Sequence, residues 1–356
     1  MTPFELLYYL GYSIKKRYAF THQKKLPHKV ISIGNITLGG TGKTPAAIAL
    51  AEEAKKRGFN PCILTRGYKG KAKGPCFVSR GGGPLLDEYH TGDEAFLMAE
   101  KLKGVPVVKD RDRYEAGMFA IQNLKSHISE HKSEFLFILD DGFQHWKLFR
   151  DKNILLIDST NPFGNRKLLP LGSLREPLKA ISRADIIVIT KTEDRKQNSE
   201  VRSRKSDPRS LVEELKQYNS KVPIFFAEHR PSAFITINGN ILPLEWAKGK
   251  NFLGFCGIGN PQSFKKTLLS ANIKMIGFKN FRDHYRYSQN DIYSMVRNAE
   301  KIGADWIVTT EKDIMRLKGF ELPLNLVALV IDFRADKKFY EEVFSGITND
   351  QIPIIK

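Results

Sequence analysis

Residues 39–44 have the types and spacing of a phosphate-binding loop, with the sequence Gly39-Gly40-Thr41-Gly42-Lys43-Thr44. An apolar run, 30–33, precedes the loop, and an alanine-rich segment with helical spacing follows it from Pro45. Between a strand and a helix, such glycines let backbone N–H groups surround phosphate oxygens, and the helix N-terminus adds partial positive charge. Lys43 would reach the β- and γ-phosphates of a nucleoside triphosphate, and Thr44 would offer its hydroxyl to Mg²⁺. The sequence therefore predicts a nucleotide site formed by Gly39, Gly40, Thr41, Gly42, Lys43 and Thr44.

Two positions of this loop depart from the usual pattern. A glycine is usual where Thr37 stands, although the pair Gly39-Gly40 partly compensates. The loop resembles the variant loops of the partition and metal-chaperone ATPases, which carry a lysine where this chain has Leu38. A regulatory ATPase or GTPase of that type, which hydrolyses nucleotide as a switch, is therefore one alternative function.

An acidic motif follows a second apolar run, 135–139, whose continuous hydrophobicity is typical of a buried strand. The run ends in Asp140 and Asp141, where phosphate-loop proteins hold Mg²⁺. A divalent cation that bridges phosphate oxygens prefers carboxylate ligands. We therefore predict that Asp140 and Asp141 serve Mg²⁺, with an acidic surface turn as the alternative.

Other charged residues have ordinary structural explanations when taken alone. Asp93 and Glu94 open a predicted helix, where acids are favoured by the helix dipole. Arg66 follows a short predicted strand, 62–65, where a solvated surface charge is common.

The fold class follows from the alternation of apolar runs and helical segments along the chain. This alternation predicts an α/β protein with a mostly parallel sheet covered by helices on both faces. We expect a P-loop domain over 1–218, a smaller α/β domain over 219–335, and a tail over 336–356 whose docking is unknown. A charged, almost non-apolar segment, 194–209, is expected to be an exposed loop.

The composition limits the partners and the compartment. The 57 Lys and Arg residues exceed the 39 Asp and Glu residues, which gives a net charge of +18. This excess favours a polyanionic partner, namely nucleic acid, an anionic membrane surface or a phosphorylated substrate. The three cysteines lack metal-ligand spacing, and their number indicates a reducing compartment. We expect no transmembrane span and no signal peptide, because apolar runs are short and the N-terminal charges follow the apolar segment.

The N-terminal segment, 4–14, is rich in aromatic and aliphatic residues and is followed by Lys15, Lys16 and Arg17. An apolar helix with a basic end can lie in the membrane interface. A helix packed on its own domain explains the same pattern equally well. The sequence leaves both possibilities open.

Eight motifs in order resemble the tetraacyldisaccharide 4′-kinase family, over about 6–332. They are GNITLGGTGKTP, TRGY, GDEA, DDGFQH, LLPLGSLREP, FCGIGNPQSF, FRDHYRYS and TTEKD. The segment 194–209 looks like an insertion beyond the family pattern. The resemblance implies that 1–218 is a P-loop kinase domain, joined by a short β linker to the smaller α/β domain. The resemblance implies ATP-dependent phosphorylation, with Mg²⁺, of the 4′-hydroxyl of a tetraacylated glucosamine disaccharide 1-phosphate, the lipid A precursor. It also implies that the enzyme acts at the cytoplasmic face of the inner membrane, where its N-terminal helix contacts anionic lipid. No nucleic-acid partner is expected.

The resemblance also implies roles for individual residues. The acid of the GDEA motif, Asp93, would act as general base together with His284 of the FRDHYRYS motif, and Lys43 would assist at the phosphate. Glu94 would join Asp140 and Asp141 around Mg²⁺. Further contacts to substrate or phosphate would come from Asn35, Arg66, Arg113, Gln144, His145, Arg175 and Glu176. For His145, a hydrogen-bonded core histidine is the alternative.

Two other functions remain to be separated from a kinase. The switch ATPase would lack a sugar-hydroxyl base, and a non-enzymatic, nucleotide-gated membrane or nucleic-acid adaptor would phosphorylate nothing. The sequence does not predict the oligomeric state or the accepted acyl chains.

Overall fold

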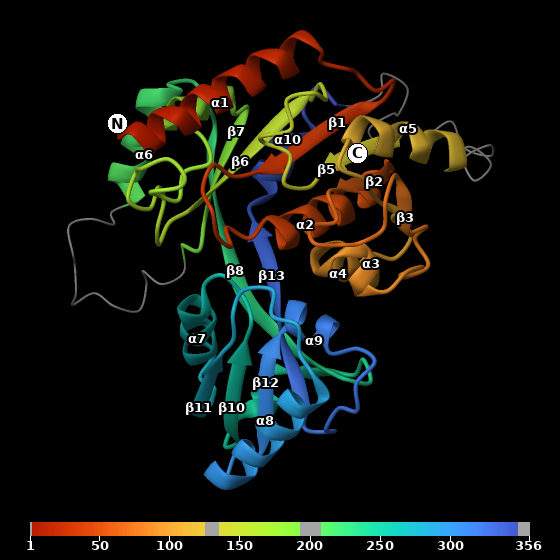
Figure 1. The fold of residues 1–356 in the computed structure, drawn as a ribbon, viewed down its shortest axis with the longest axis vertical. Coiled ribbons are helices and arrows are strands. Elements are labelled where there is room, and N and C mark those ends of the chain that lie inside the picture. The colour runs from red at the N-terminus through yellow and green to blue at the C-terminus, as the bar shows by residue number, and fades with distance from the viewer. Residues whose placement is uncertain (1, 125–134, 193–207, 348–356) are drawn as a thin grey trace. The chain divides into compact units, whose positions relative to one another are not determined.

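The computed structural model describes residues 2–124, 135–192 and 208–347 (Figure 1). Most of the predicted exposed loop, 194–209, lies outside the described residues, and a helix begins at Pro208. The chain divides into two compact units. The first comprises Met1–His229 and the chain from Phe333 onward, and the second comprises Arg230–Asp332. Our sequence division ended the first domain at residue 218 and assigned 336–356 to a separate tail.

The elements of the first unit alternate between helix and strand. In chain order they are α1 (Pro3–Thr21), β1 (Lys29–Gly34), α2 (Lys43–Lys56), β2 (Asn60–Thr65), β3 (Cys76–Ser79), α3 (Glu88–Thr91), α4 (Asp93–Lys101), β4 (Val107–Lys109), α5 (Arg113–Leu124), β5 (Phe135–Leu139), β6 (Lys152–Asp158), the 3₁₀ helix η2 (Leu178–Arg183), β7 (Ile186–Thr190), α6 (Pro208–Tyr218) and α10 (Lys337–Phe344). The strands β8 (Ile224–Thr236) and β13 (Leu326–Ala335) each begin in one unit and end in the other.

The sheet of the first unit has the strand order β8-β7-β6-β1-β5-β2-β4-β3. These strand pairs are parallel except for β3, which runs antiparallel to β4. In register, Val30 of β1 lies opposite Phe137 of β5, and Ile33 lies opposite Ile154 of β6. This confirms the predicted α/β fold with a mostly parallel sheet.

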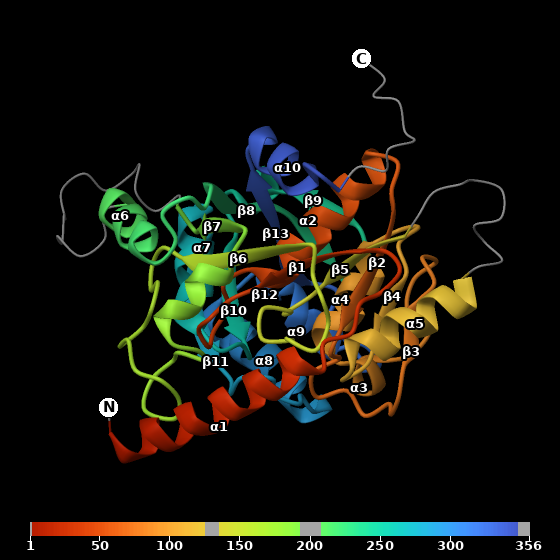
Figure 2. The ribbon, with the colours of Figure 1, turned by 90° about the horizontal axis from the view of Figure 1, so that it is seen from above.

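Helices cover both faces of this sheet because its strands are apolar on both sides. In β5, Leu136 and Ile138 pack in the cluster that holds α2 and α4, whereas Phe137 and Leu139 pack with α5 on the opposite face. Figure 2 shows α2 and α10 on one side of β1 and β6, and α1 on the other. Successive strand residues point to opposite faces, so a continuous apolar run builds both halves of the core.

The second unit is a smaller α/β layer. It contains β9 (Ile241–Pro243), the 3₁₀ helix η4 (Leu244–Ala247), β10 (Asn251–Cys256), α7 (Pro261–Ser270), β11 (Lys274–Asn280), α8 (Gln289–Ile302), β12 (Trp306–Thr310) and α9 (Glu311–Arg316). The order β11-β10-β12-β13 is parallel throughout. Phe252 of β10 packs in the cluster of α7, and Leu253 and Phe255 pack in the cluster of α8. The two faces of this sheet are therefore also covered.

The C-terminal helix α10 docks on the first unit. Phe339, Val343 and Phe344 are buried in the same cluster as the alanines of α2. The ring of Phe339 lies 5.7 Å from that of Phe225, and the ring of Phe344 lies 5.6 Å from that of Phe59. These contacts join the end of the chain to elements that come much earlier in the sequence.

We expect the change Phe339→Ala to lower the free energy of unfolding by about 3–5 kcal/mol, because it empties a buried aromatic site. Urea unfolding followed by circular dichroism measures this difference. Leu85, which is 56% exposed, provides a control. The change Leu85→Ala should alter stability by no more than about 0.5 kcal/mol. Equal effects of the two substitutions would contradict the docking of α10.

Candidate active site

The glycine-rich loop occupies the turn between β1 and α2. Gly42 caps α2 with φ 85°, and Gly39 has φ 118°. A Cβ on Gly42 would lie 2.0 Å from the ring of His229, so space as well as conformation requires glycine there. No side chain caps α2 at Gly42, so none occupies the first N–H groups of the helix, which point toward the loop as at any helix N-terminus. This arrangement suits an anion.

Lys43 extends from the first turn of α2 toward two oxygen atoms. Its Nζ lies 3.3 Å from Oδ1 of Asn35 and 3.7 Å from Oδ1 of Asp141. Asn35 is fully buried and donates from Nδ2 to the carbonyl of Thr37 at 2.8 Å. Asn35 therefore braces the loop and the lysine in this structure.

Asp140 and Asp141 follow β5, which lies between β1 and β2. Oδ2 of Asp140 accepts a hydrogen bond from Thr65 at the end of β2, at 3.0 Å, whereas its buried Oδ1 has no partner among the described residues. Burial, followed by the negative charges of Glu94 and Asp141, raises the pKa of Asp140 to about 7.

Asp141 has the opposite shift although it is the next residue. Burial raises its pKa, but the positive charges of Lys43 and Arg175 outweigh burial and bring the pKa below its usual value. Arg175 NH1 donates to both carboxylate oxygens, at 3.1 and 2.9 Å. Asp141 is thus ionised and held by a cation, whereas the carboxyl of Asp140 is held by a hydroxyl.

The acids at the end of β5 fit a divalent cation that also binds phosphate. Within the described ranges, no three His, Cys, Asp or Glu side chains form a complete metal site. Mg²⁺ in phosphoryl-transfer sites needs only one or two carboxylates, because phosphate and water complete its octahedron. The unpartnered Oδ1 of Asp140 and the negative charge of Glu94 beside it meet that requirement.

Asp93 is the first residue of α4 and is 2% exposed. Its Oδ1 accepts a hydrogen bond from the backbone N–H of Glu94 at 2.9 Å. The preceding Gly92 has φ 88°, and a Cβ there would lie 2.4 Å from the carbonyl oxygen of Tyr68. The GDEA motif is therefore pressed against the loop that follows β2, which carries Arg66.

The other predicted contact residues have different environments. Burial lowers the pKa of Arg113 to about 10, while the charges of Asp140 and Asp141 oppose that shift. Arg66 is exposed at the end of β2. Burial and the charge of Arg113 lower the pKa of His145 to about 3, so this ring is neutral. Its buried Nε2 has no partner in the described part of the chain.

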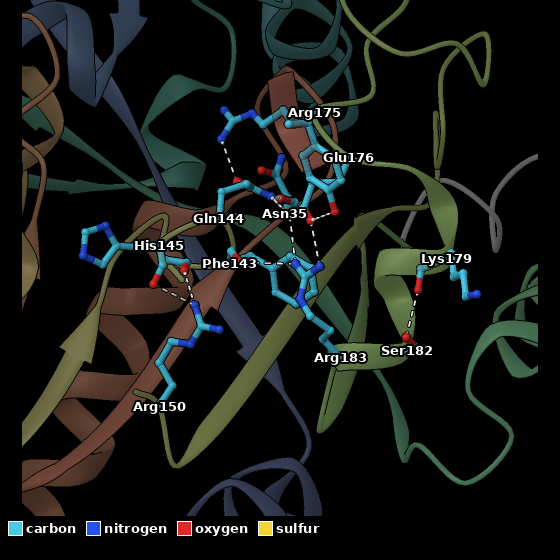
Figure 3. A network of polar contacts seen from close by, with 12 residues as sticks. Asn35, Phe143, Gln144, His145, Arg150, Arg175, Glu176, Lys179, Ser182 and Arg183 are labelled. Atoms are coloured by element: carbon cyan, nitrogen blue, oxygen red, sulfur yellow. Dashed lines mark hydrogen bonds and ion pairs between the residues drawn. The ribbon is translucent and has the colours of Figure 1, made fainter. Parts of the chain in front are cut away.

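Gln144 and Glu176 belong to a polar network that is joined to Asn35, just before the glycine-rich loop (Figure 3). Glu176 is fully buried and accepts hydrogen bonds from Gln144 at 2.8 Å and from Arg183 at 2.7 and 2.9 Å. Gln144 also donates to the backbone carbonyl of Asn35 at 2.7 Å. Tyr12 of α1 completes the set by donating to Glu176 at 3.0 Å.

Arg183 and Tyr12 are not among the site residues that we predicted from the sequence. Nothing near Arg183 signals its role, because it is a single basic residue in a short 3₁₀ helix. Tyr12 follows Tyr8 by one helical turn, and Tyr8 donates to the carbonyl of Arg175 at 2.9 Å. This spacing is the signal that could have shown which face of α1 meets the protein.

His284 lies in the second unit, on the loop between β11 and α8. Its backbone has φ 55°, and its N–H donates to the carbonyl of Gly257 at 2.9 Å. Nδ1 of the ring lies 3.3 Å from NH2 of Arg316. The loop thus fixes both the backbone and one ring nitrogen.

The chain is similar to known proteins over most of its length. The family model described as tetraacyldisaccharide-1-P 4′-kinase matches residues 1–348. The tetraacyldisaccharide 4′-kinase of Syntrophus aciditrophicus is 37% identical, over 94% of this chain and 89% of its own length. The enzyme of that name from Aquifex aeolicus is 36% identical, over 90% of this chain and 88% of its own length.

A solved structure is similar over nearly the whole chain. It is the "apo" form of LpxK from Aquifex aeolicus in complex with ATP, with a TM-score of 0.73, 32% sequence identity and coverage of 97% of both chains. These relatives favour neither the switch ATPase nor the non-enzymatic adaptor. The chain belongs to the tetraacyldisaccharide-1-phosphate 4′-kinase family.

Proposed function

We propose that this kinase uses Asp93 and His284 to activate the acceptor and the loop around Lys43 to hold the donor. ATP is the donor, and the 4′-hydroxyl of the tetraacylated glucosamine disaccharide 1-phosphate is the acceptor. The observation that carries the proposal is the short distance between Lys43, at the start of the helix that follows β1, and Asp141, just after the adjacent strand β5: the two side chains are 3.7 Å apart. This arrangement suits the phosphates of a donor nucleotide. The product is the 4′-phosphorylated lipid A precursor of lipopolysaccharide biosynthesis in Gram-negative bacteria.

The transfer proceeds as an in-line displacement. The 4′-hydroxyl loses its proton to Asp93, its oxygen forms a bond to the γ-phosphorus, and the bond from that phosphorus to the β-γ bridging oxygen breaks to release ADP. Lys43 and the loop N–H groups bind the phosphates and offset their charge. Asp93 is buried, and the N–H of Glu94 fixes one of its oxygens. Because a carboxylate at a helix start is a poor base alone, His284 would assist it.

Asp140, Asp141, Glu94 and Thr44 would hold Mg²⁺. The ion supplies charge neutralisation and orientation of the phosphates when it is bound. Arg175 keeps Asp141 ionised and in place, and Thr65 fixes one oxygen of Asp140. Arg66 and Arg113 lie at the same edge of the sheet and would contact phosphate or substrate.

The membrane contact is proposed for α1. Leu7 and Ile14, which lie seven residues apart and so share a face, are each 71% exposed, whereas Tyr8 and Tyr12 on another face donate hydrogen bonds to the rest of the first unit. The two explanations left open by the sequence thus apply to different faces of one helix. Among the described helices, none is long and apolar enough to cross a bilayer. The net charge of +18 fits anionic lipid and substrate phosphate, and supports a peripheral site on the cytoplasmic face of the inner membrane. The kinase family, and not the charge, argues against a nucleic-acid partner.

The direct test uses labelled ATP and the lipid disaccharide in detergent, with the label followed into the lipid. We expect the wild type to phosphorylate the disaccharide. Absence of transfer under conditions where ATP binds would overturn the proposed function.

The change Asp93→Asn should lower kcat by about 10²–10⁴-fold, because it removes the general base. Affinity for ATP, measured by fluorescence with a labelled analogue, should stay within about twofold since the phosphate loop is untouched. Glu115→Gln is the matched control, because Glu115 is half-exposed in α5 and pairs with the exposed Lys24. Full turnover by Asp93→Asn would remove Asp93 from the mechanism.

Metal affinity should depend on the ionisation of Asp140. This pKa of about 7 lies above that of an ordinary aspartate, so the carboxyl is protonated at pH 6 and ionised at pH 8. Because a metal ligand must be deprotonated, affinity for Mn²⁺ as a spin probe should rise about tenfold from pH 6 to pH 8. Electron paramagnetic resonance of free Mn²⁺ measures it. Asp140→Asn should flatten the dependence, and an unchanged slope in this variant would exclude Asp140.

Binding to vesicles should depend on the exposed face of α1. The double change Leu7→Ser and Ile14→Ser should weaken partition onto phosphatidylglycerol-containing vesicles by about tenfold or more, because two apolar side chains no longer enter the interface. Sedimentation with the vesicles measures partition. Leu324→Ser, at a site 77% exposed, should leave partition unchanged. Equal loss in both proteins would show that α1 has no special role.

A further inference from the structure

The second unit contains a buried polar cluster at the ends of β10 and β12. Its members are Gly257 after β10, Thr310 at the end of β12, Asp313 and Arg316 in α9, and Tyr287 before α8. Asp313 is fully buried, and the side chain of Arg316 is 5% exposed. Buried charges of this kind need partners in fixed geometry.

The carboxylate of Asp313 accepts hydrogen bonds at both of its oxygens. Oδ1 accepts from the N–H of Gly257 at 3.1 Å, from Tyr287 at 2.9 Å and from Arg316 NH1 at 3.0 Å. Oδ2 accepts from Thr310 at 2.6 Å. The carboxylate therefore has no freedom to rotate, and it holds the guanidinium of Arg316 in one orientation.

Arg316 uses its two terminal nitrogens for different acceptors. NH1 donates to the carbonyl of Gly257 at 2.8 Å as well as to Asp313. NH2 lies 3.3 Å from Nδ1 of His284. A guanidinium has N–H donors and no acceptor. Nδ1 must consequently accept this hydrogen bond, and the ring proton of His284 is on Nε2.

The backbone holds His284 against the same cluster. Gly257 accepts at its carbonyl oxygen both from Arg316 and from the N–H of His284. His284 adopts φ 55°, a left-handed conformation that few non-glycine residues have without tertiary support. One peptide carbonyl thus fixes the distance between the guanidinium and the imidazole.

We infer that Arg316, held by Asp313, is a positioning residue that fixes His284 as the Nε2–H tautomer. This rests on the proposed function, in which His284 works with Asp93. A second proton on the ring would have to go on Nδ1, where it would face the N–H of Arg316 and break their hydrogen bond. His284 is therefore a hydrogen-bond donor at Nε2, and in the proposed function the proton of the 4′-hydroxyl goes to Asp93 alone.

The first test is the tautomer itself in the full-length protein. Long-range ¹⁵N–¹H NMR of histidine-labelled enzyme distinguishes a protonated from an unprotonated ring nitrogen, and His284→Gln identifies the signal. We expect His284 of the wild type to show a proton on Nε2 and an unprotonated Nδ1. A ring proton on Nδ1 would overturn the inference. This measurement involves no catalysis, so a protein that transfers phosphate but shows the other tautomer would refute the inference and leave the proposed function standing.

The second test removes the donor. Arg316→Met should allow both tautomers and lower kcat about 10–100-fold, with KM for ATP and lipid nearly unchanged, because the ring is present but no longer aligned. Arg316→Lys keeps a charged donor and should restore the Nε2–H signal and most of kcat. Arg297→Met, at an exposed arginine of α8, should change neither. Wild-type tautomer and turnover in Arg316→Met would overturn the inference.

Removing Arg316 alone leaves Asp313 buried without its cation and can prevent folding. The double variant Arg316→Met with Asp313→Asn removes both charges and keeps an amide oxygen as the hydrogen-bond acceptor within the cluster. We expect it to fold, to show mixed tautomers and to have the same reduced kcat. Retention of a single Nε2–H tautomer in this variant would also overturn the inference.

Discussion

The first unit depends on β5 being the strand between β1 and β2. In a parallel sheet, neighbouring strands end at the same edge, so this order brings together the phosphate loop after β1, the two acids after β5 and Thr65 at the end of β2. A different order would separate Lys43 from Asp141 by a further strand spacing of about 4.8 Å or more. The order of the strands therefore determines which side chains can meet at this edge of the sheet.

The different pKa values of Asp140 and Asp141 follow from where the basic side chains lie at this edge of the sheet. Lys43 and Arg175 both approach Asp141, whereas the carboxyl of Asp140 beside it accepts from the hydroxyl of Thr65. Adjacent acids thus keep different affinities for protons, one ionised at ordinary pH and the other near its midpoint. Because only Asp141 is fully ionised at neutral pH, the two acids favour a cation that binds together with its own anionic ligands, as a metal–nucleotide complex does.

The sequence predicted those elements that are formed by one continuous segment of the chain. The run 135–139 forms β5, and the loop 39–44 joins β1 to α2 as expected, because both depend on local pattern. The docking of α10 through Phe339 depends on contacts with Phe225 and Phe333, which no local pattern encodes. Arg183 and Arg316 were missed for the same reason, since each is a single arginine whose acceptors come from other elements. His284 was predicted as a site residue only through the family resemblance of its motif, and no sequence pattern indicated its partner in α9, Arg316.

The network around Glu176 gives α1 a second importance beyond any contact with lipid. Tyr12 shields a carboxylate that also binds Gln144 and Arg183, and Gln144 continues to the carbonyl of Asn35, the residue that holds Lys43. Deleting α1 would admit water to Glu176 and loosen the support of the phosphate loop. A shortened enzyme would therefore bind its nucleotide more weakly, and its kinetic constants would not represent those of the full chain.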